Sequence, residues 1–536
     1  MNTFSKLLLS SSILIVPGLI DAQSLQTSKS QEVINAVEKV YNEELQEDAT
    51  NYNVYFRRAH LYYGQNQYLR ALSDIDNAIR YTPTDDRDLL SQEYALRANI
   101  YIMTERPEDA LADITKALEY EPTSYALLYQ KANLEYELGK YASAKEDFTR
   151  LNRIHNRSLE SLIGLARVAV KENNLGLANE YVDEAVAFYP AESEAYLRRA
   201  SVRRLMGNNN GAVDDMILAI AVDKNNSKAI AEIVNMANSD YNAVISGLSN
   251  AITQAPDVGV YYYIRAMIAQ AHYRYVSAIA DYNTIIEKKL YNYHGIHARL
   301  AECYYSICDY TSALDQINIA LGSSRKGAYY LTSSMIYLAL GNTELAKLYA
   351  ERALLESDNQ AALIQSALCS LADGDYALAS NQFGELIINN PESPVNYIIR
   401  AWIMEDKLKQ QSDAIGFLSR CISLDYEDSD YNSYLGFALN LMGQNDQARV
   451  WIDGILESRP ADIDGRIHYI AAALYSQTGD VDKAFDCMQK ALERGYANLY
   501  DWKHYDVANL SVAPLRNDPR FDELLNNYDY LFTPTR

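Results

Sequence analysis

Apolar residues recur every three to four positions along this chain in paired runs, and the pattern then starts again. The stretch 91–124 contains one complete unit, in which polar residues at 104–108 separate two apolar runs. This spacing is typical of amphipathic helices, so the stretch predicts two short helices that pack together. Ala98 and Ala110 lie where the two helices would cross, and their small side chains allow the backbones to approach closely.

Alanine at position 20 of this unit, counted from Ser91, marks the repeats along the chain. Successive alanines are 33–36 residues apart, except for one interval of 39 and one of 66. The interval of 39 predicts an extra loop at 86–90, and the interval of 66 contains a repeat without the alanine, centred on Val244. The pattern predicts thirteen repeats, near 52–85, 91–124, 125–158, 159–192, 193–226, 225–258, 259–292, 294–327, 327–360, 360–393, 394–428, 429–462 and 465–498.

The unit resembles the tetratricopeptide repeat, which has a large residue at position 4, small residues at positions 8, 20 and 27, and proline at position 32. In 91–124 these places hold Tyr94, Ala98, Ala110, Ala117 and Pro122. The resemblance implies an all-α, right-handed superhelical solenoid of helix-turn-helix repeats over 52–494, with capping helices at both ends. It also implies a protein that works by binding other molecules.

Both ends of the chain differ from the repeats. Residues 1–22 combine Lys6, an apolar run and a small Ala22, a pattern typical of a cleaved signal peptide. The apolar run is shorter than the ~20 residues that span a bilayer, and no cysteine follows it for lipid attachment. We therefore expect an exported protein, periplasmic or extracellular, without a membrane span in the mature chain. We expect a polar leader and an N-terminal cap helix at 23–51, and a C-terminal capping segment at 495–536.

The charge of the chain narrows the range of partners. It has 71 Asp and Glu against 48 Lys and Arg, a net charge of -23. Nucleic acids are bound mainly through Lys and Arg that neutralise phosphates, so this composition argues against a nucleic-acid partner. A disulfide framework is also not expected. Cys303 and Cys308 would lie roughly 8 Å apart on one helix, and Cys303, Cys369, Cys421 and Cys487 fit positions for small apolar side chains.

In five repeats a basic residue at position 7 is followed by an aspartate sixteen residues later. Where position 7 is not basic the aspartate is missing too, as at Leu165 with Tyr181. Arg400 is the exception, and its repeat has an inserted residue near Gln410. This covariation between repeats predicts structural ion pairs that join the two helices of one repeat, and not a basic stripe for ligands. The predicted pairs are Arg58–Asp74, Arg97–Asp113, Lys131–Asp147, Arg199–Asp215 and Arg265–Asp281.

The concave face of such a solenoid is its usual binding site, and the first helix of each repeat lines it at positions 2, 5, 9 and 12. Aromatic side chains there offer a large contact area, and asparagine can bond a peptide backbone as donor and acceptor. We expect Trp402, Asn99 and Asn133 to face this groove; several of the tyrosines could instead pack between neighbouring first helices. The candidate groove residues are Phe56, His60, Tyr63, Asn99, Tyr129, Asn133, Tyr136, Tyr263, Met267, Tyr305, Met335 and Trp402.

A clamp for a C-terminal carboxylate is a known binding mode of this family, with basic residues at positions 2, 5 or 6 and asparagine at position 9. Asn99 and Asn133 occupy position 9 in adjacent repeats, but Leu96 and Gln130 stand at position 6. The sequence therefore does not predict this clamp.

Signatures of catalysis are missing from the sequence. It contains no GxSxG, P-loop, HExxH or glycine-rich dinucleotide turn, and the repeats leave no room for a catalytic domain. His294 and His297 could share a helix face, but no acidic or cysteine partners occur at matching spacing. We predict that the protein is not an enzyme and has neither a cofactor nor a metal site.

Two functions of different classes fit these observations. The first is an interaction scaffold of the bacterial cell envelope that binds a protein segment or subunit on the concave face. The second is a protein that binds glycan or cell-wall polymer through the groove tyrosines, since tyrosine can stack on sugar rings. The sequence predicts neither the identity of the partner nor the oligomeric state.

Overall fold

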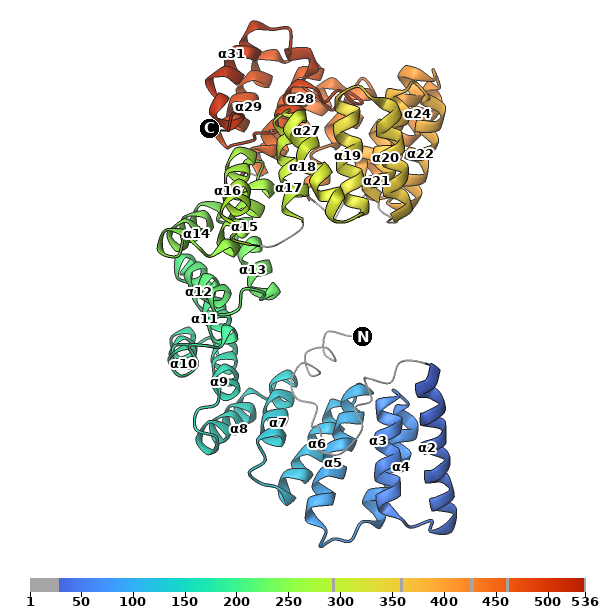
Figure 1. Ribbon diagram of the computed structural model, residues 1–536, viewed down its shortest axis with the longest axis vertical. Coiled ribbons are helices and arrows are strands. Elements are labelled where there is room, and N and C mark those ends of the chain that lie inside the picture. The colour runs from blue at the N-terminus through green and yellow to red at the C-terminus, as the bar shows by residue number, and fades with distance from the viewer. Residues whose placement is uncertain (1–27, 292–294, 357–359, 425–428, 459–461, 535–536) are drawn as a thin grey trace. The chain divides into compact units, whose positions relative to one another are not determined.

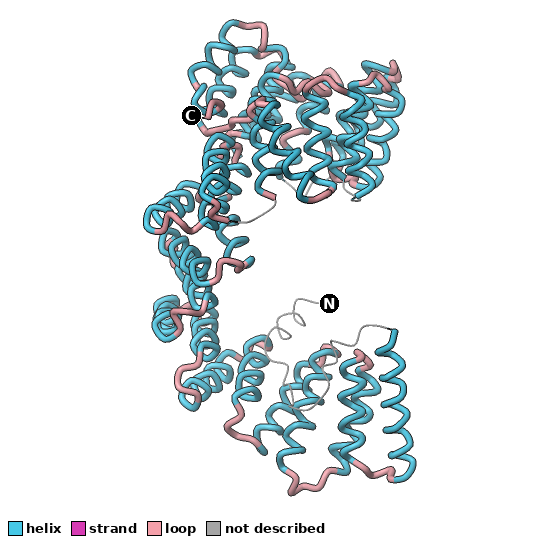
Figure 2. Tube along the Cα trace, viewed as in Figure 1, coloured by secondary structure: helices cyan, strands magenta, loops and turns pink. Residues whose placement is uncertain are grey.

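The computed structural model describes residues 28–291, 295–356, 360–424, 429–458 and 462–534. Every regular element in these ranges is a helix (Figure 2). The predicted signal peptide, residues 1–22, lies outside the described residues. None of the described helices combines the length and the apolar sequence needed to cross a membrane. The chain divides into two compact units, Met1–Ala229 and Ile230–Arg536, each described by itself (Figure 1).

The N-terminal unit begins with a cap helix that precedes five helix pairs. The cap packs on the first pair, because Tyr62 donates a 2.8 Å hydrogen bond to Glu38. The helices are α2 Ser28–Glu47, α3 Tyr52–Gly64, α4 Tyr68–Tyr81, α5 Arg87–Met103, α6 Pro107–Tyr120, α7 Tyr125–Glu137, α8 Tyr141–Ile154, α9 Leu159–Lys171, α10 Leu175–Phe188, α11 Ser193–Leu205 and α12 Asn209–Val222.

The C-terminal unit continues with eight further pairs, the first of which starts at the unit boundary, and ends in a segment of short helices. The paired helices are α13 Ser227–Ala237, α14 Tyr241–Gln254, α15 Gly259–Ala271, α16 Tyr275–Lys288, α17 Ile296–Ser306, α18 Tyr310–Ser323, α19 Gly327–Ala339, α20 Thr343–Glu356, α21 Gln360–Ala372, α22 Tyr376–Asn389, α23 Pro394–Trp402 with the π-helix η2 Ile403–Lys407, α24 Gln411–Ser423, α25 Ser429–Asn432, α26 Leu435–Leu441, α27 Asn445–Ser458, α28 Arg466–Thr478 and α29 Val481–Glu493. The segment after them contains α30 Leu499–Lys503, η3 Ala513–Leu515, α31 Pro519–Asn527 and η4 Asp529–Leu531.

The thirteen helix pairs confirm the fold that the alanine spacing predicts. Ala71, Ala110 and Ala144 are fully buried at position 20 of their repeats, where the second helix crosses the first. Larger side chains there would hold the helices apart and leave voids in a close-packed core. Cys303, Cys369, Cys421 and Cys487 are buried, and all five cysteines are free thiols.

The predicted extra loop at 86–90 is wrong. Asp86 is the N-cap of α5, and its side chain accepts a hydrogen bond from the backbone N–H of Leu89. The five additional residues therefore lengthen the first helix of this repeat, because an aspartate cap allows the helix to begin one turn earlier.

The inserted residue near Gln410 is accommodated within a helix. The N–H of Leu408 bonds to the carbonyl of Ile403, five residues back, and this closes the π turn of η2. One extra residue in a helix commonly produces such a turn, often at a functional site. The turn follows directly after Trp402.

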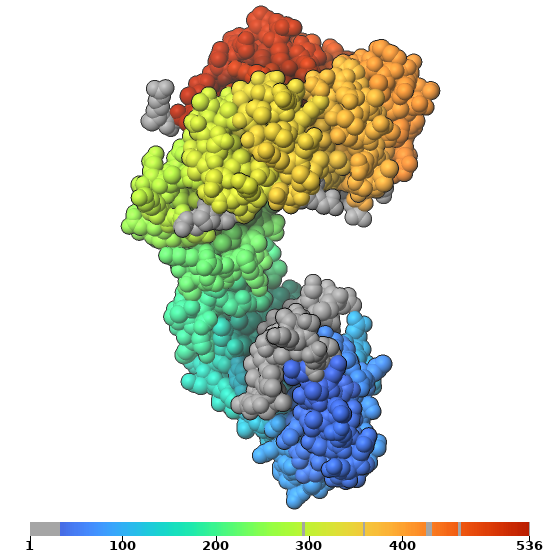
Figure 3. Space-filling view, turned by 45° about the vertical axis from the view of Figure 1, so that its right-hand side comes forward, coloured from blue at the N-terminus to red at the C-terminus, as the bar shows by residue number. Residues whose placement is uncertain are grey.

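The C-terminal segment contacts repeats far from it in the sequence. The rings of Tyr273 and Tyr496 lie 4.6 Å apart and those of Tyr305 and Tyr500 lie 4.8 Å apart. Arg274 donates a 3.0 Å hydrogen bond to the carbonyl of Arg494. Figure 3 shows the red C-terminal segment against the yellow repeats of the same unit. The segment therefore caps the last helix pair, with Leu515 and Phe521 in that core, and also closes the unit on α15–α18.

Candidate functional site

All five predicted ion pairs between the helices of one repeat are present, and we call each of them a staple. In four of them arginine grips both carboxylate oxygens, as in Arg97, whose Nε and Nη2 lie 2.7 and 2.8 Å from the oxygens of Asp113. Lys131 bonds to Asp147 in the same place. The other staples are Arg58–Asp74, Arg199–Asp215 and Arg265–Asp281. The hydrogen bond with its aspartate raises the pKa of Arg58 and likewise that of Arg265.

Each staple arginine also reaches back to the preceding repeat or cap, which the sequence analysis missed. Arg97 bonds to Asp76 at 2.7 Å, and Arg199 to Asp183 at 3.2 Å. Asp76 and Asp183 both stand at position 25 of the preceding repeat, and Ser249 holds the same place before Arg265. The four arginine staples therefore each join three helices, whereas Lys131 joins α7 and α8 and bonds to Glu135 in its own helix. A comparison between neighbouring repeats, and not only within each repeat, could have found this pattern.

Four of the predicted groove residues are buried, and eight are partly exposed. Tyr305 is buried beneath the C-terminal segment, next to Tyr500, so it packs inside the unit. The buried residues are Phe56, Asn133, Tyr263 and Tyr305. The partly exposed ones are His60, Tyr63, Asn99, Tyr129, Tyr136, Met267, Met335 and Trp402.

Two amides expected to face a ligand bind the next repeat instead. Asn99 accepts a 2.6 Å hydrogen bond from Gln130, and Asn133 accepts one of 2.9 Å from Arg167. These bonds align neighbouring first helices. His60 packs edge-on against Phe56, and burial lowers its pKa to about 4, so it is neutral at pH 7. The first helices of this unit are therefore held mainly by internal contacts.

Trp402 has a different environment, because it lines a cavity of about 910 Å³ within the C-terminal unit. The π turn after Trp402 and the turn between α26 and α27 form two sides, and the C-terminal segment supplies a third. Its lining is Trp402, Glu405, Asp406, Lys407, Lys409, Gln411, Asn440, Leu441, Gly443, Asn445, Gln477, Asp506 and Asn509. We call this cavity the Trp402 pocket.

The chemistry of the Trp402 pocket is that of an aromatic surface surrounded by amides and carboxylates. Lys407 lies over the Trp402 ring at 4.9 Å and bonds to Asp406 at 2.8 Å. This bond holds the pKa of Asp406 below its ordinary value. Asn440 donates a 3.0 Å hydrogen bond to Asn445, which orients both amides. The pocket can therefore offer a ligand hydrogen-bond donors, acceptors and a ring for stacking.

Sequence reasoning identified Trp402 but none of the other lining residues. Asp506 and Asn509 lie about a hundred residues further along the chain, and only the fold of the C-terminal segment brings them to the pocket. The insertion near Gln410 was the available signal, since it shows that this repeat departs from the regular pattern.

The two histidines considered as metal ligands, and not predicted to form a site, are only partly described. His294 lies outside the described residues, and His297 shares a 2.7 Å hydrogen bond with Gln316. No group of three or more His, Cys, Asp or Glu side chains suited to a metal ion occurs in the described part of the chain.

Comparison with known proteins points to one repeat type. Sequence models of the tetratricopeptide repeat match residues 96–155, 327–359 and 465–494. No curated protein matches the chain. Similar solved structures include YrrB, described as having an unusual peptide-binding site, with 18% identity over 36% of this chain and 96% of its own and a TM-score of 0.30. A tetratricopeptide repeat protein from Parabacteroides merdae is 16% identical, the match covers 52% of this chain and 99% of that protein, and the TM-score is 0.25. Yeast Tom70 is 15% identical, the match covers 77% of this chain and 99% of Tom70, and the TM-score is 0.34.

Proposed function

We propose that this tetratricopeptide-repeat protein is a non-enzymatic scaffold that binds a segment of a partner protein, and that the segment sits in the Trp402 pocket. Proteins built from these repeats commonly mediate protein–protein interaction, and this supports the general role. The observation that carries the specific proposal is the cavity of about 910 Å³ in which Trp402 meets several amide side chains.

A peptide segment suits this pocket for two reasons. Amide side chains both donate and accept, so residues such as Asn445 and Gln477 can pair with peptide N–H and carbonyl groups. Trp402 gives an apolar side chain of the segment a rigid surface at small entropic cost. Three carboxylates against two lysines leave the lining without a positive charge excess, so a neutral segment fits better than an acidic one.

A neutral glycan is the second candidate function. The same observation favours it, because a sugar ring can stack on Trp402 while its hydroxyls bond to the surrounding amides and carboxylates. The two candidates differ in the polymer that the pocket recognises.

We place the scaffold in the bacterial cell envelope, with its partner there as well, because residues 1–22 have the pattern of a signal peptide. Fractionation of cells that produce the full chain tests this location. A shortened chain in the periplasm or medium is expected, whereas a full-length chain in the cytosol would contradict the proposal.

Arrays of peptides and of neutral glycans, probed with the purified chain, test the choice of ligand. We expect a set of peptides to bind the wild type and to lose binding with Trp402→Ala. Tyr530→Ala is the control, since Tyr530 is an aromatic residue 66% exposed and outside the pocket. Binding to glycans alone, lost in the same variant, would establish the second candidate and contradict the first.

A further inference from the structure

The slot that a staple fills is defined by the repeats that have one. In the four repeats with an arginine staple, a tyrosine at position 4 lies beneath the guanidinium: that of Arg97 is 5.3 Å from the Tyr94 ring, and that of Arg265 is 5.8 Å from the Tyr262 ring. The walls of the slot are position 23 of the same repeat and position 25 of the preceding one, where the arginine finds its oxygen partners. An arginine therefore occupies the space between two successive second helices.

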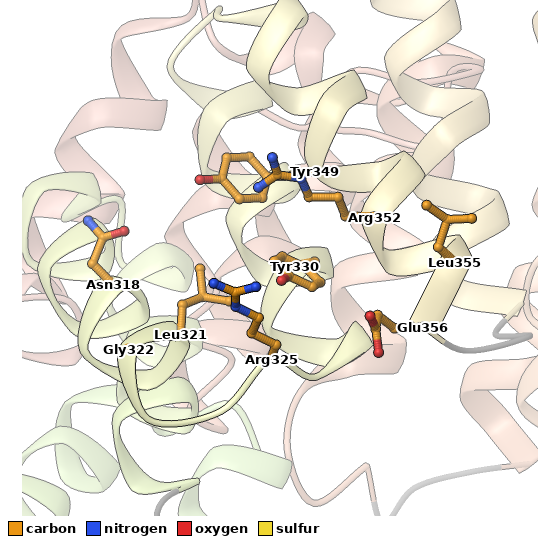
Figure 4. A pocket seen from close by; sticks show the side chains of 9 residues that line it. All are labelled: Asn318, Leu321, Gly322, Arg325, Tyr330, Tyr349, Arg352, Leu355 and Glu356. Carbon is orange, nitrogen blue, oxygen red and sulfur yellow. The ribbon is translucent and has the colours of Figure 1, made fainter.

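The repeat formed by α19 and α20 has the slot but no staple. Position 4 of this repeat is a tyrosine, Tyr330, as in the repeats with an arginine staple. Position 7 is Ser333, whose hydroxyl donates a hydrogen bond to the carbonyl of Tyr329 in its own helix. The walls are Tyr349 at position 23 and Asn318 at position 25 of the preceding repeat. A cavity of about 580 Å³ opens there, lined by Asn318, Tyr330 and Tyr349 among others (Figure 4).

The charge of this slot is reversed relative to its counterparts. The aspartate is gone, and the exposed Arg325 and Arg352 line the same cavity as Tyr330 (Figure 4). The Arg352 guanidinium lies 6.0 Å from the Tyr330 ring and 5.5 Å from the Tyr349 ring. Glu356 is the one acidic residue in the described lining, so the two arginines leave the slot with an excess of positive charge.

We propose that this slot, formed by α18, α19 and α20, binds a carboxylate of an acidic peptide segment. Two guanidinium groups that line one cavity can bind the oxygens of a carboxylate through charge-assisted hydrogen bonds. Leu355 on the rim is 86% exposed and gives an apolar neighbour of that carboxylate a surface to cover. The chain as a whole carries -23 and repels anions at long range, so attraction of a carboxylate depends on local positive charge, which Arg325 and Arg352 supply at this slot. The site is separate from the Trp402 pocket, and the proposal does not depend on it.

Fluorescence anisotropy with the purified full chain tests the slot. The probe is a labelled peptide of alternating Leu and Glu, and the matched peptide has Gln in place of Glu. We expect the Glu peptide alone to bind, and Arg325→Gln with Arg352→Gln to weaken it at least about tenfold, as for the loss of charged hydrogen bonds. Lys326→Gln removes one positive charge beside the slot but outside its lining, and should change the affinity less than about twofold.

Rebuilding the staple gives a second test that keeps the total charge change small. Ser333→Arg with Tyr349→Asp installs the Arg–Asp pair found in four other repeats, and the new guanidinium should fill the slot. We expect peptide binding to be lost while helical circular dichroism persists. The proposal is overturned if the Gln peptide binds equally, if Lys326→Gln weakens binding as much as the double variant, if the rebuilt chain still binds, or if inorganic phosphate at the peptide's concentration displaces the peptide.

Discussion

The staple between Arg97 and Asp113 makes the strongest quantitative prediction. Their side chains are 20% and 8% exposed, while Asp76, the second partner of Arg97, is 44% exposed. Arg97→Leu leaves the Asp113 carboxylate buried without its partner. Breaking a buried pair in this way costs about 3–5 kcal/mol, and the partial exposure of Arg97 reduces this to about 2–4 kcal/mol.

The reverse change should cost less. Asp113→Leu leaves Arg97 bonded to Asp76, so we expect a loss of about 1–2 kcal/mol. The double variant removes both charges and replaces them with apolar groups, which is often nearly neutral. Its loss should therefore be smaller than that of Arg97→Leu alone, with a coupling energy of about 2 kcal/mol or more.

Hydrogen exchange measured by mass spectrometry is the appropriate assay, because a repeat array does not unfold as a single two-state unit. The opening free energy of amides in α5 and α6 reports the local effect. Arg106→Leu is the control: Arg106 and Asp109 form an exposed pair in the same repeat, 47% and 51% exposed, so its loss should stay below about 1 kcal/mol. If the double variant loses as much opening free energy as the two single variants together, the staple is refuted.

Three further predictions concern single side chains. Glu93 is fully buried and accepts a 2.7 Å hydrogen bond from Thr82, and burial raises its pKa from 4.5 to about 7. Because the pKa of Glu93 is higher in the folded than in the unfolded chain, the folded state loses stability as pH rises through about 7 and the buried carboxyl ionises. Glu93→Gln should therefore slow exchange of α5 amides relative to the wild type at pH 8 and leave their exchange at pH 5 almost unchanged. Burial raises the pKa of Asp501 from 3.8 to about 6, so the melting temperature should fall from pH 5 to pH 7.5, and Asp501→Asn should reduce that fall; an unchanged slope would contradict this. Trp402 is only partly exposed but lines a cavity, so Trp402→Ala should leave the melting temperature within about 4 °C while weakening capture of the partner, and a larger drop would assign it to the core.

The sequence predicts those parts of the fold that depend on neighbouring positions. Ala110 and its equivalents report helix crossings, and the covariation of position 7 with position 23 reports the staples, because both ends of each contact recur at a fixed spacing. Asp76 escaped notice because its partner lies in another repeat, where the five extra residues of α5 shift the spacing.

The burial of Tyr305 and the Trp402 pocket depend on contacts between distant segments, which the repeat spacing does not predict. Tyr305 has the position of a groove residue, but the C-terminal segment covers it through Tyr500. The Trp402 pocket likewise needs Asp506 and Asn509, which belong to no repeat. A repeat pattern shows which residues share a helix face, and it contains no information on which distant segment lies against that face.

Crosslinking in cells tests the central claim most directly. A photoreactive residue in place of Asn445 reports what lies in the Trp402 pocket, and the same residue in place of Leu69, which is 80% exposed in the other unit, is the control. We predict that the photoreactive residue at position 445 crosslinks one protein that the residue at position 69 does not, and that Trp402→Ala abolishes this crosslink. Crosslinks to glycan alone, or the same proteins from both positions, would contradict the account.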